Sequence, residues 1–365
     1  MIEQSNLAQP ISDAEGQWRK DCMPDSPKLA VVITCYNYES FVERAIKSVL
    51  DQGRNDCEIV VVDDGSTDGS WEVITRCGIA AYRITNSGQR IACLFGLDQT
   101  RAPFVLFLDA DDELKPGALN TIIDQLDSGV AKLQFPLTRI DADGNAIGGS
   151  LTSLKTFRSR DDLARQVIKT GNYKTPTTSG NVFRRDLCEL LREADYDIAV
   201  DGVILFAAPL MGDIVSLSQE LGCYRIHGRN DSGLGRLPDA RGLTRDLDRY
   251  LARMEHLQKI IRRLGLDQEP FNPRDTFYFR ERKLFLDIAS GQRPRLASLL
   301  ALIPKLLAEP YSLKNKIAMT ALYTLASVLP NDRGKVLLAY RLKTGDRTAL
   351  GLAREIIGRR PPFHA

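Results

Sequence analysis

The stretch LAVVITCYNYESFVERAIKSVLDQGRNDCEIVVVD, residues 29–63, decides the fold. It begins and ends with short, continuous apolar runs, at 29–34 and 58–63, which are typical of strands buried on both faces of a sheet. Between them, residues 39–52 carry apolar side chains at helical spacing. Two buried strands joined by a helix predict a parallel pair with a crossover connection, the unit of an α/β sheet.

The same alternation of strand and helix continues after this stretch. Ligands of open parallel sheets bind beyond the carboxyl ends of the strands. The polar clusters at 34–37, 63–68 and 109–112 follow three expected strand ends, so we predict that they converge in space. The further expected elements are a helix at 68–77, a strand at 80–85, a helix at 87–99, a strand at 104–109 and a helix with Pro116 in its first turn.

Composition describes an ordinary globular chain. Its 365 residues are 43% hydrophobic and 26% charged, enough for two domains. The seven cysteines form no C-x-x-C pair, which favours neither a zinc site nor a disulfide framework and fits a reducing compartment. The first residues lack a basic segment followed by an apolar run, so we expect no secretory signal and a cytoplasmic location.

Charge is divided unevenly along the chain. From Arg241 onward, 24 Lys and Arg accompany 12 Asp and Glu, whereas the first 240 residues hold 25 basic and 35 acidic residues. Such a split indicates two regions with different partners. We therefore expect a loose leader at 1–27, an α/β domain at 28–235 and a basic, mostly helical region at 236–365.

The basic region contains two apolar segments, 296–311 and 315–330. They are either packed helices of a bundle or helices lying in the plane of a membrane surface, and packing is the commoner explanation of apolar stripes. The longest stretch without charge, 317–331, has 15 residues and contains Pro330, so it is too short to span a bilayer.

FLDADDEL, residues 107–114, places Asp109, Asp111 and Asp112 directly after an expected strand. Paired carboxylates at such a position suit Mg²⁺ or Mn²⁺, with phosphate oxygens and water completing the shell. The alternative is an acidic loop that caps the following helix through Asp112. The same Asp-x-Asp spacing recurs in DADG, residues 141–144, but there it predicts the solvated tip of a hairpin within 132–149.

The combination of DDGSTDGS at 63–70 with LDADD at 108–112 resembles the start of a family 2 glycosyltransferase with the GT-A fold. The resemblance extends over roughly residues 28–232. It implies a Rossmann-like, mixed and mainly parallel sheet sandwiched by helices. It also implies an inverting enzyme that moves a sugar from a nucleoside diphosphate sugar, most simply a UDP-sugar, to a hydroxyl of a glycan or lipid-linked acceptor with the help of Mn²⁺ or Mg²⁺.

The resemblance also implies roles for individual residues. The implied nucleotide-binding residues are Thr34, Tyr36 (against the base), Asp64, Asp109 and Arg90, and the implied metal ligands are Asp111, Asp109 and His227. Arg90 enters because Leu94 and Phe95 stand where family members commonly carry Arg-Asn. The competing interpretations are a core Tyr36, aspartates that only form turns, and a His227 that hydrogen-bonds a backbone carbonyl.

The segment from 193 to 232 resembles the family's second signature, in which Asp201 corresponds to the catalytic base. Val200 stands where the family usually has a further acid. The alternative is that Asp201 only caps the helix that follows it. In TTSGNVFRRD, residues 177–186, Gly180 and Asn181 would line the acceptor side.

Three other functions compete with sugar transfer. A non-catalytic module that binds nucleotide sugars or carbohydrates stays open as an alternative. A sugar nucleotidyltransferase is disfavoured because TCYNYES, residues 34–40, has neither glycine nor a basic residue. Nucleic-acid binding is not expected, since the basic region lacks interleaved aromatic residues. A peripheral contact of that region with the inner membrane face is a further hypothesis.

Overall fold

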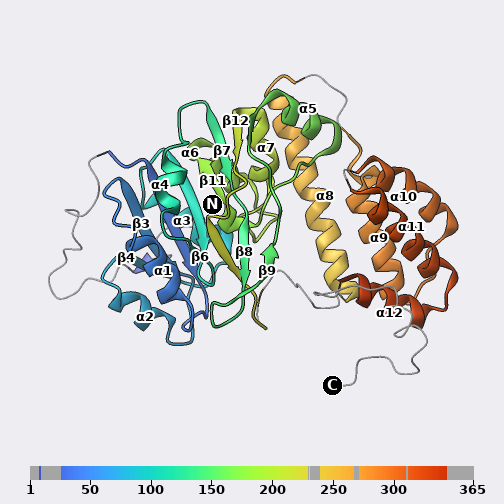
Figure 1. Ribbon diagram of the computed structural model, residues 1–365, viewed down its shortest axis with the longest axis horizontal. Coiled ribbons are helices and arrows are strands. Elements are labelled where there is room, and N and C mark those ends of the chain that lie inside the picture. The colour runs from blue at the N-terminus through green and yellow to red at the C-terminus, as the bar shows by residue number, and fades with distance from the viewer. Residues whose placement is uncertain are drawn as a thin grey trace. The chain divides into compact units, whose positions relative to one another are not determined.

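The apolar runs of the N-terminal half form neighbouring parallel strands. The structure is a computed structural model and describes residues 8–9, 26–228, 230, 239–266, 271–309 and 311–342. The parallel strands lie in the order β4-β3-β2-β5. They are β2 (Leu29–Cys35), β3 (Cys57–Asp63), β4 (Ala80–Ile84) and β5 (Phe104–Asp109), which confirms the predicted strands. Figure 1 labels β3 and β4 of this group.

Helices cover both faces of these strands, because successive side chains point to opposite faces. Ile33 belongs to a core that includes α1, α2 and α4, whereas Val62 packs with Ala92 of α3 on the other face. A Cβ on Gly96 of α3 would lie 2.3 Å from Val32 Cγ1, so only glycine permits this approach. The predicted helices are confirmed, somewhat shortened, as α1 (Val42–Leu50), α2 (Ser70–Arg76), α3 (Gln89–Asp98) and α4 (Ala118–Ile123).

The sheet becomes mixed beyond β5. Its full order is β1-β4-β3-β2-β5-β11-β7-β12-β10, and β11 is antiparallel to both of its neighbours. At the opposite edge, β1 (Ala8–Gln9), which falls in the expected leader, pairs with β4. The added elements are β7 (Val130–Gln134), β10 (Phe157–Ser159), α5 (Asp161–Thr170), η3 (Thr178–Gly180), β11 (Asn181–Arg184), α6 (Arg185–Cys188), η4 (Glu189–Glu193), α7 (Val203–Met211) and β12 (Asp213–Ser216).

The hairpin predicted at 132–149 is only partly correct. Residues 130–134 form β7 of the large sheet, and only β8 and β9 make the antiparallel hairpin. The break falls at Pro136, whose lack of an N–H makes continuous pairing unfavourable. The tip is a turn as expected, because Asp141 Oδ1 accepts the backbone N–H groups of Asp143 and Asn145. A second sheet has the order β6-β13-β8-β9, with β6 (Glu113–Leu114), β13 (Gly222–Arg225), β8 (Leu137–Ile140) and β9 (Ala146–Ser150).

A fully buried lysine lies on β7. The ammonium of Lys132 donates to Gln134 Oε1 at 3.0 Å, to Tyr173 Oη at 3.0 Å and to Thr175 Oγ1 at 2.5 Å. These partners are neutral, and burial lowers the pKa of Lys132 well below its usual range. The unfolded chain regains the ordinary pKa of about 10.4 and therefore binds up to one more proton than the folded chain at pH values between the two pKa values.

We expect the free energy of unfolding to rise with pH because of Lys132. The contribution of Lys132 is up to about 1.4 kcal/mol per pH unit, from its lowered folded pKa up to about pH 10.4. Urea unfolding at pH 7 and pH 9 measures it: Lys132→Met should gain less stability over this interval than the wild type. Lys169→Met, at an exposed lysine of α5, is the control and should match the wild type. Equal pH dependence in all three proteins contradicts the prediction.

The C-terminal region is helical, as predicted. The chain divides into one unit of residues 1–227 and 256–269 and a second of residues 228–255 and 270–365. Helices of the second unit pack around their own apolar core, which includes Phe285 of α9 and Tyr323 of α11. None of the described helices combines the length and the apolar character needed to cross a membrane. The helices are α8 (Ala240–Arg263), α9 (Phe277–Ala289), α10 (Leu296–Ala308), α11 (Leu313–Val328) and α12 (Asn331–Leu342), with a 3-10 turn η5 (Pro273–Asp275).

Candidate active site

The three polar clusters converge, as the strand order predicted. Cys35 pairs with Asp63 across β2 and β3, and Thr34 pairs with Asp109 across β2 and β5. The carboxyl ends of three adjacent strands therefore lie at one edge of the sheet. Cys93 of α3 interacts with two of these strand ends. Its thiol hydrogen-bonds Thr34, and burial, together with the charge of Asp109, raises its pKa.

The loop after β2 presents Tyr36 to solvent. The Tyr36 side chain is 45% exposed, so the interpretation of this residue as part of the core is wrong. The next residue, Asn37, has a left-handed backbone (φ 60°), a conformation that asparagine tolerates better than most residues. Its N–H donates to Ser66 Oγ at 2.9 Å, and its side-chain oxygen accepts the N–H of Thr67 at 2.7 Å. These bonds join the loop to the DDGSTD segment.

The two aspartates that end β3 have different surroundings. Asp63 is fully buried, accepts the Ser66 N–H and forms an ion pair with Arg83 at 3.1 Å, so it supports the turn. Asp64 accepts the N–H groups of Ser87 at 2.7 Å and Gly88 at 2.8 Å, one on each oxygen. Burial nevertheless raises the pKa of Asp64. A carboxylate has about four acceptor positions, so Asp64 keeps capacity for one more donor.

Gln89, which the sequence analysis did not single out, connects distant parts of the site. Its side-chain nitrogen donates to Asp109 Oδ1 at 2.6 Å, and its oxygen accepts the Val200 N–H at 3.4 Å. Because Val200 precedes Asp201, this one amide links the metal-site candidate to the candidate base. The available signal was its position: Gln89 opens a helix just beyond the strand end of β4.

Arg90 follows Gln89, but its side chain is engaged by backbone carbonyl groups of the protein. Its guanidinium donates to the carbonyl oxygens of Asp197 and Leu191, each at 2.9 Å, and its backbone N–H donates to the carbonyl of Ile198. These bonds hold the segment that leads to Asp201. The placement therefore gives Arg90 a positioning function, and we do not retain it among the nucleotide contacts.

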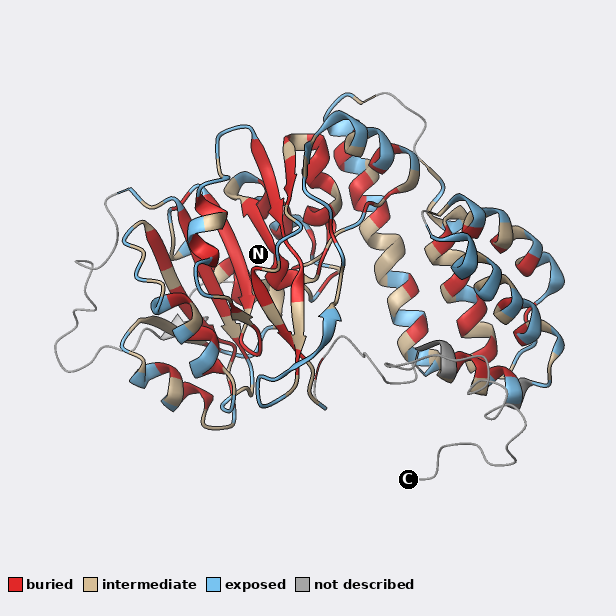
Figure 2. Cartoon of the chain, in the orientation of Figure 1, coloured by how far each residue is buried: buried red, intermediate tan, exposed pale blue. Residues whose placement is uncertain are grey.

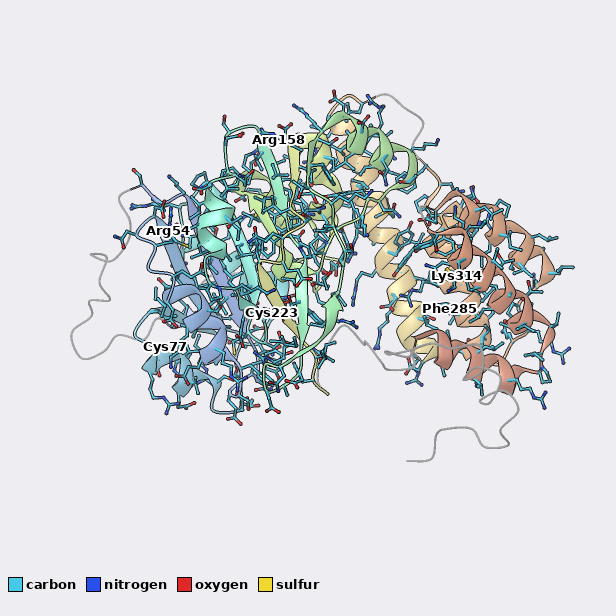
Figure 3. The ribbon with its side chains drawn as sticks, in the orientation of Figure 1. Arg54, Cys77, Arg158, Cys223, Phe285 and Lys314 are labelled. Carbon is cyan, nitrogen blue, oxygen red and sulfur yellow. The ribbon has the colours of Figure 1, made fainter. Side chains whose placement is uncertain are left out.

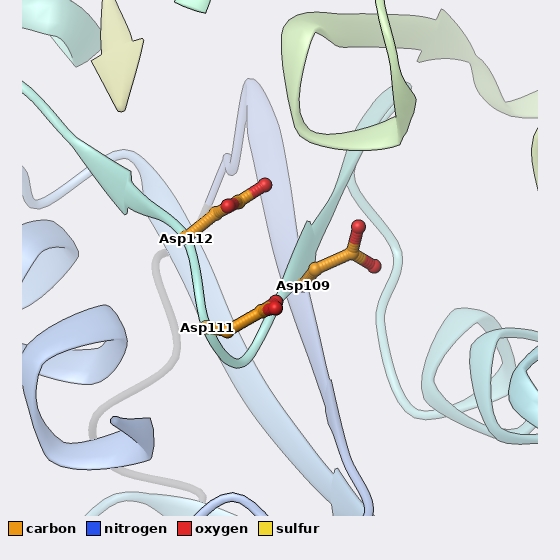
Figure 4. A group of neighbouring side chains, drawn as sticks. All are labelled: Asp109, Asp111 and Asp112. Carbon is orange, nitrogen blue, oxygen red and sulfur yellow. The ribbon is translucent and has the colours of Figure 1, made fainter. Parts of the chain in front are cut away.

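Asp109, Asp111 and Asp112 lie together on the turn after β5 (Figure 4). Each offers one oxygen within 4.8 Å of the others. Burial, reinforced by the neighbouring carboxylates, raises the pKa values of Asp109 and Asp112 well above their usual range. The capping alternative for Asp112 is wrong, because the N-cap of α4 is Gly117 and Asp112 accepts the Arg225 N–H at 3.0 Å.

Asp201 belongs to the same cluster of charges. Its carboxylate is close enough to be among the causes of the raised Asp109 pKa, after burial and Asp111. The helix α7 starts at Val203 and its N-cap is Gly202, so Asp201 is not the capping residue of that helix. The structure thus brings Asp201 near Asp109, although the two residues lie far apart in the sequence.

β13 and its extension bring a histidine and an arginine to the acidic turn. His227 Nε2 lies 2.9 Å from Asp111 Oδ2, and its ring packs on Phe41 with centroids 4.9 Å apart. Arg225 is fully buried and donates to the carbonyls of Asp111 and Asp141, besides an ion pair with Glu113. Arg225 therefore holds the acidic turn against the hairpin tip.

A comparison with protein-family models identifies the N-terminal part of the chain. Residues 30–191 match the model of glycosyl transferase family 2. This segment is a glycosyl transferase family 2 domain. With the parallel strands and helical layers above, the match confirms the GT-A fold that the resemblance implied.

The alignments with individual relatives extend over only part of each relative's length. An uncharacterised glycosyltransferase of Nostoc sp. is 37% identical over 56% of this chain and 66% of its own length. The GalNAc(5)-diNAcBac-PP-undecaprenol β-1,3-glucosyltransferase of Campylobacter jejuni is 36% identical over 33% of this chain and 40% of its own. The chain thus spans less than two thirds of both relatives. The structure of S. aureus TarS 1–349 with UDP-GlcNAc covers 86% of both chains, with 18% identity and a TM-score of 0.46.

The segment expected on the acceptor side of the glycosyltransferase is buried. A Cβ on Gly180 would lie 2.7 Å from the Phe135 carbonyl, so the close approach is to the protein's own backbone. Asn181 is fully buried, and its amide nitrogen donates to the Thr177 carbonyl at 2.7 Å. Ser179, which was not predicted, accepts the Asp109 N–H at 3.2 Å. The segment therefore supports the acidic turn, and we do not retain Gly180 and Asn181 as acceptor contacts.

Proposed function

We propose that the chain is an inverting transferase that moves a sugar from a nucleoside diphosphate sugar, most simply a UDP-sugar, to a hydroxyl group. The observation that carries the proposal is the pair of hydrogen bonds that Gln89 makes to Asp109 and to the backbone N–H of Val200, because it ties the residue before Asp201 to the acidic turn. Metal-assisted displacement needs carboxylates that bind the cation which neutralises the diphosphate. It also needs a separate carboxylate that can take a proton.

The donor set of the acidic turn fits a hard divalent cation. Asp109, Asp111 and Asp112 offer carboxylate oxygens within 4.8 Å of one another, and such oxygens are the ligands that Mg²⁺ and Mn²⁺ prefer. We assign Asp111 as the direct ligand, Asp109 as a second, and His227 as a neighbour that orients Asp111. When bound, the cation supplies charge stabilisation to the departing diphosphate.

We assign the nucleoside to the edge of the sheet at the carboxyl ends of β2 and β3. Tyr36 is exposed and offers its ring to the base, while Thr34 lies at the strand end beside it. Asp64 is held rigidly by two backbone N–H groups and would accept the ring N–H that uracil offers. Uracil, thymine and guanine carry such a ring N–H and cytosine and adenine do not, so this acceptor is compatible with a uridine nucleotide and disfavours cytidine and adenosine nucleotides.

Asp201 is assigned as the base. It takes the proton of the acceptor hydroxyl while that oxygen attacks the anomeric carbon. The bond from this carbon to the diphosphate oxygen breaks, its electron pair leaves with the nucleoside diphosphate, and the anomeric configuration inverts. Gln89 and Arg90 hold the segment before Asp201, so they keep the base in position.

We further propose a glycan or lipid-linked glycan as acceptor. The Campylobacter relative is named for action on a polyprenyl-diphosphate glycan, and this supports the choice. The match covers 33% of the chain, so it supports the class of acceptor and not its identity.

A panel of nucleotide sugars tests the proposed function. With Mn²⁺ present, we expect UDP-sugars to raise the melting temperature more than ADP- or CDP-sugars, whose bases lack a ring N–H for Asp64, and at least one UDP-sugar to be hydrolysed slowly without acceptor. Omitting Mn²⁺ serves as the control. Protection without hydrolysis, or without transfer to any acceptor offered, favours the non-catalytic binding module, and no protection by any donor contradicts the proposal.

A further inference from the structure

Helices α10 and α11 expose a set of large apolar side chains. In the described residues, seven large hydrophobic side chains are more than half exposed, and six of them lie on these two consecutive helices. Their exposures run from 54% to 72%. We name this set the apolar face: Leu296, Leu300, Leu307, Leu313, Ile317 and Val328.

The apolar face is distinct from the packed side of the same helices. On α10, Leu299, Leu302 and Leu306 are buried in the core of the second unit, as is Tyr323 on α11. The two helices also pack against each other. Both therefore turn one apolar side to the same core and a second apolar side away from it. Figure 2 shows exposed, pale blue stretches along both helices. Packing within the bundle accounts only for the first side.

Basic residues flank the apolar face. Arg293 and Arg295 precede α10 and are exposed, and Lys314 is exposed at the start of α11 (Figure 3). Between residues 291 and 328 the sequence holds five Lys and Arg and a single acid, Glu309. Helices with one apolar side and Lys or Arg beside it are typical of segments that lie in the interface of an anionic bilayer.

We propose that the apolar face docks on an anionic lipid bilayer, with α10 and α11 lying in the plane of the membrane surface. The leucines would enter the boundary between head groups and acyl chains, and the basic residues would contact anionic head groups. A second copy of the chain fits less well, because pairing two such faces would bring the basic residues of both copies together. The proposal does not depend on the proposed sugar transfer.

Vesicle flotation of the full chain tests the proposal. We expect binding to vesicles of phosphatidylcholine with phosphatidylglycerol and much weaker binding to phosphatidylcholine alone. Replacing Arg293 and Arg295 by glutamine should weaken binding about fivefold per charge, since each basic residue near the surface contributes about 1 kcal/mol. Raising the salt concentration should weaken binding of the wild type in the same direction.

Variants of the apolar face identify the contact. Leu300→Glu combined with Ile317→Glu should reduce partition to anionic vesicles at least about tenfold. Ile147→Glu, at an exposed isoleucine of β9, is the matched control and should bind like the wild type. In the Leu300→Trp variant, tryptophan emission should shift to shorter wavelength when anionic vesicles are added.

Three outcomes would overturn the proposal. The first is no flotation with anionic vesicles. The second is flotation that the double variant leaves unchanged, which would mean that another surface binds. The third is a dimer seen by light scattering without lipid and lost in the double variant, with no vesicle binding, which would make the apolar face a contact between copies. Nucleotide-sugar protection, measured on the same preparations, separates each outcome from failure of the proposed function.

Discussion

Asp201→Asn is expected to reduce the rate of sugar transfer by about 10²–10⁴-fold, the usual contribution of a positioned general base. Asparagine keeps the shape of the side chain but cannot take a proton from the acceptor hydroxyl. The affinity for UDP in the presence of Mn²⁺ should stay within about twofold of the wild type, because the base does not hold the nucleotide. Transfer is followed by product formation and affinity by calorimetry.

Asp195→Asn is the matched control for this variant. Asp195 lies on the same segment, six positions before Asp201, and is exposed. Its substitution should leave both transfer and affinity unchanged. Transfer by Asp201→Asn at the wild-type rate would show that another group is the base.

Asp111→Ala should lose the metal-dependent part of nucleotide binding. Since Asp111 is assigned as the direct ligand, we expect the affinity for UDP with Mn²⁺ to fall at least about 100-fold, to the value that the wild type shows with EDTA. Asp111→Asn, which keeps the contact distance to His227, should show the same loss with a fold closer to the wild type. Calorimetry with and without Mn²⁺ measures the difference.

A second Asp-x-Asp pair in the sequence provides the control for Asp111→Ala. Asp143 belongs to the second Asp-x-Asp pair, at an exposed hairpin tip. Asp143→Ala should bind UDP and Mn²⁺ like the wild type. If it loses binding as Asp111→Ala does, or if Asp111→Ala binds normally, the assignment of the metal site is wrong.

The centre of the fold could be predicted because its signals are local. Buried parallel strands appear as continuous apolar runs, such as 29–34, and they place the polar residues that follow them at one edge. The convergence of Thr34, Asp64 and Asp109 follows from strand order alone. The split of the expected hairpin at Pro136 was missed because the two halves pair with strands that are distant in the sequence.

The side-chain contacts of the supporting residues could not be predicted from the sequence. Gln89 touches Asp109 and the backbone of Val200, and Ser179 touches the backbone of Asp109, across separations of 20 to 111 positions. Neither forms a local pattern. Arg90 and Asn181 were given ligand contacts because they lie in segments near the site, whereas their side chains bond to backbone carbonyls. Position on the correct loop therefore does not determine side-chain direction.

A crystal structure of the chain with UDP and Mn²⁺ tests the central claim most directly. We predict the uracil against Tyr36 and hydrogen-bonded to Asp64, the ion on Asp111 between protein and diphosphate, and Asp201 on the open side of the same site. A nucleotide bound away from the acidic turn, or an Asp201 that faces a different pocket from the diphosphate, would contradict it.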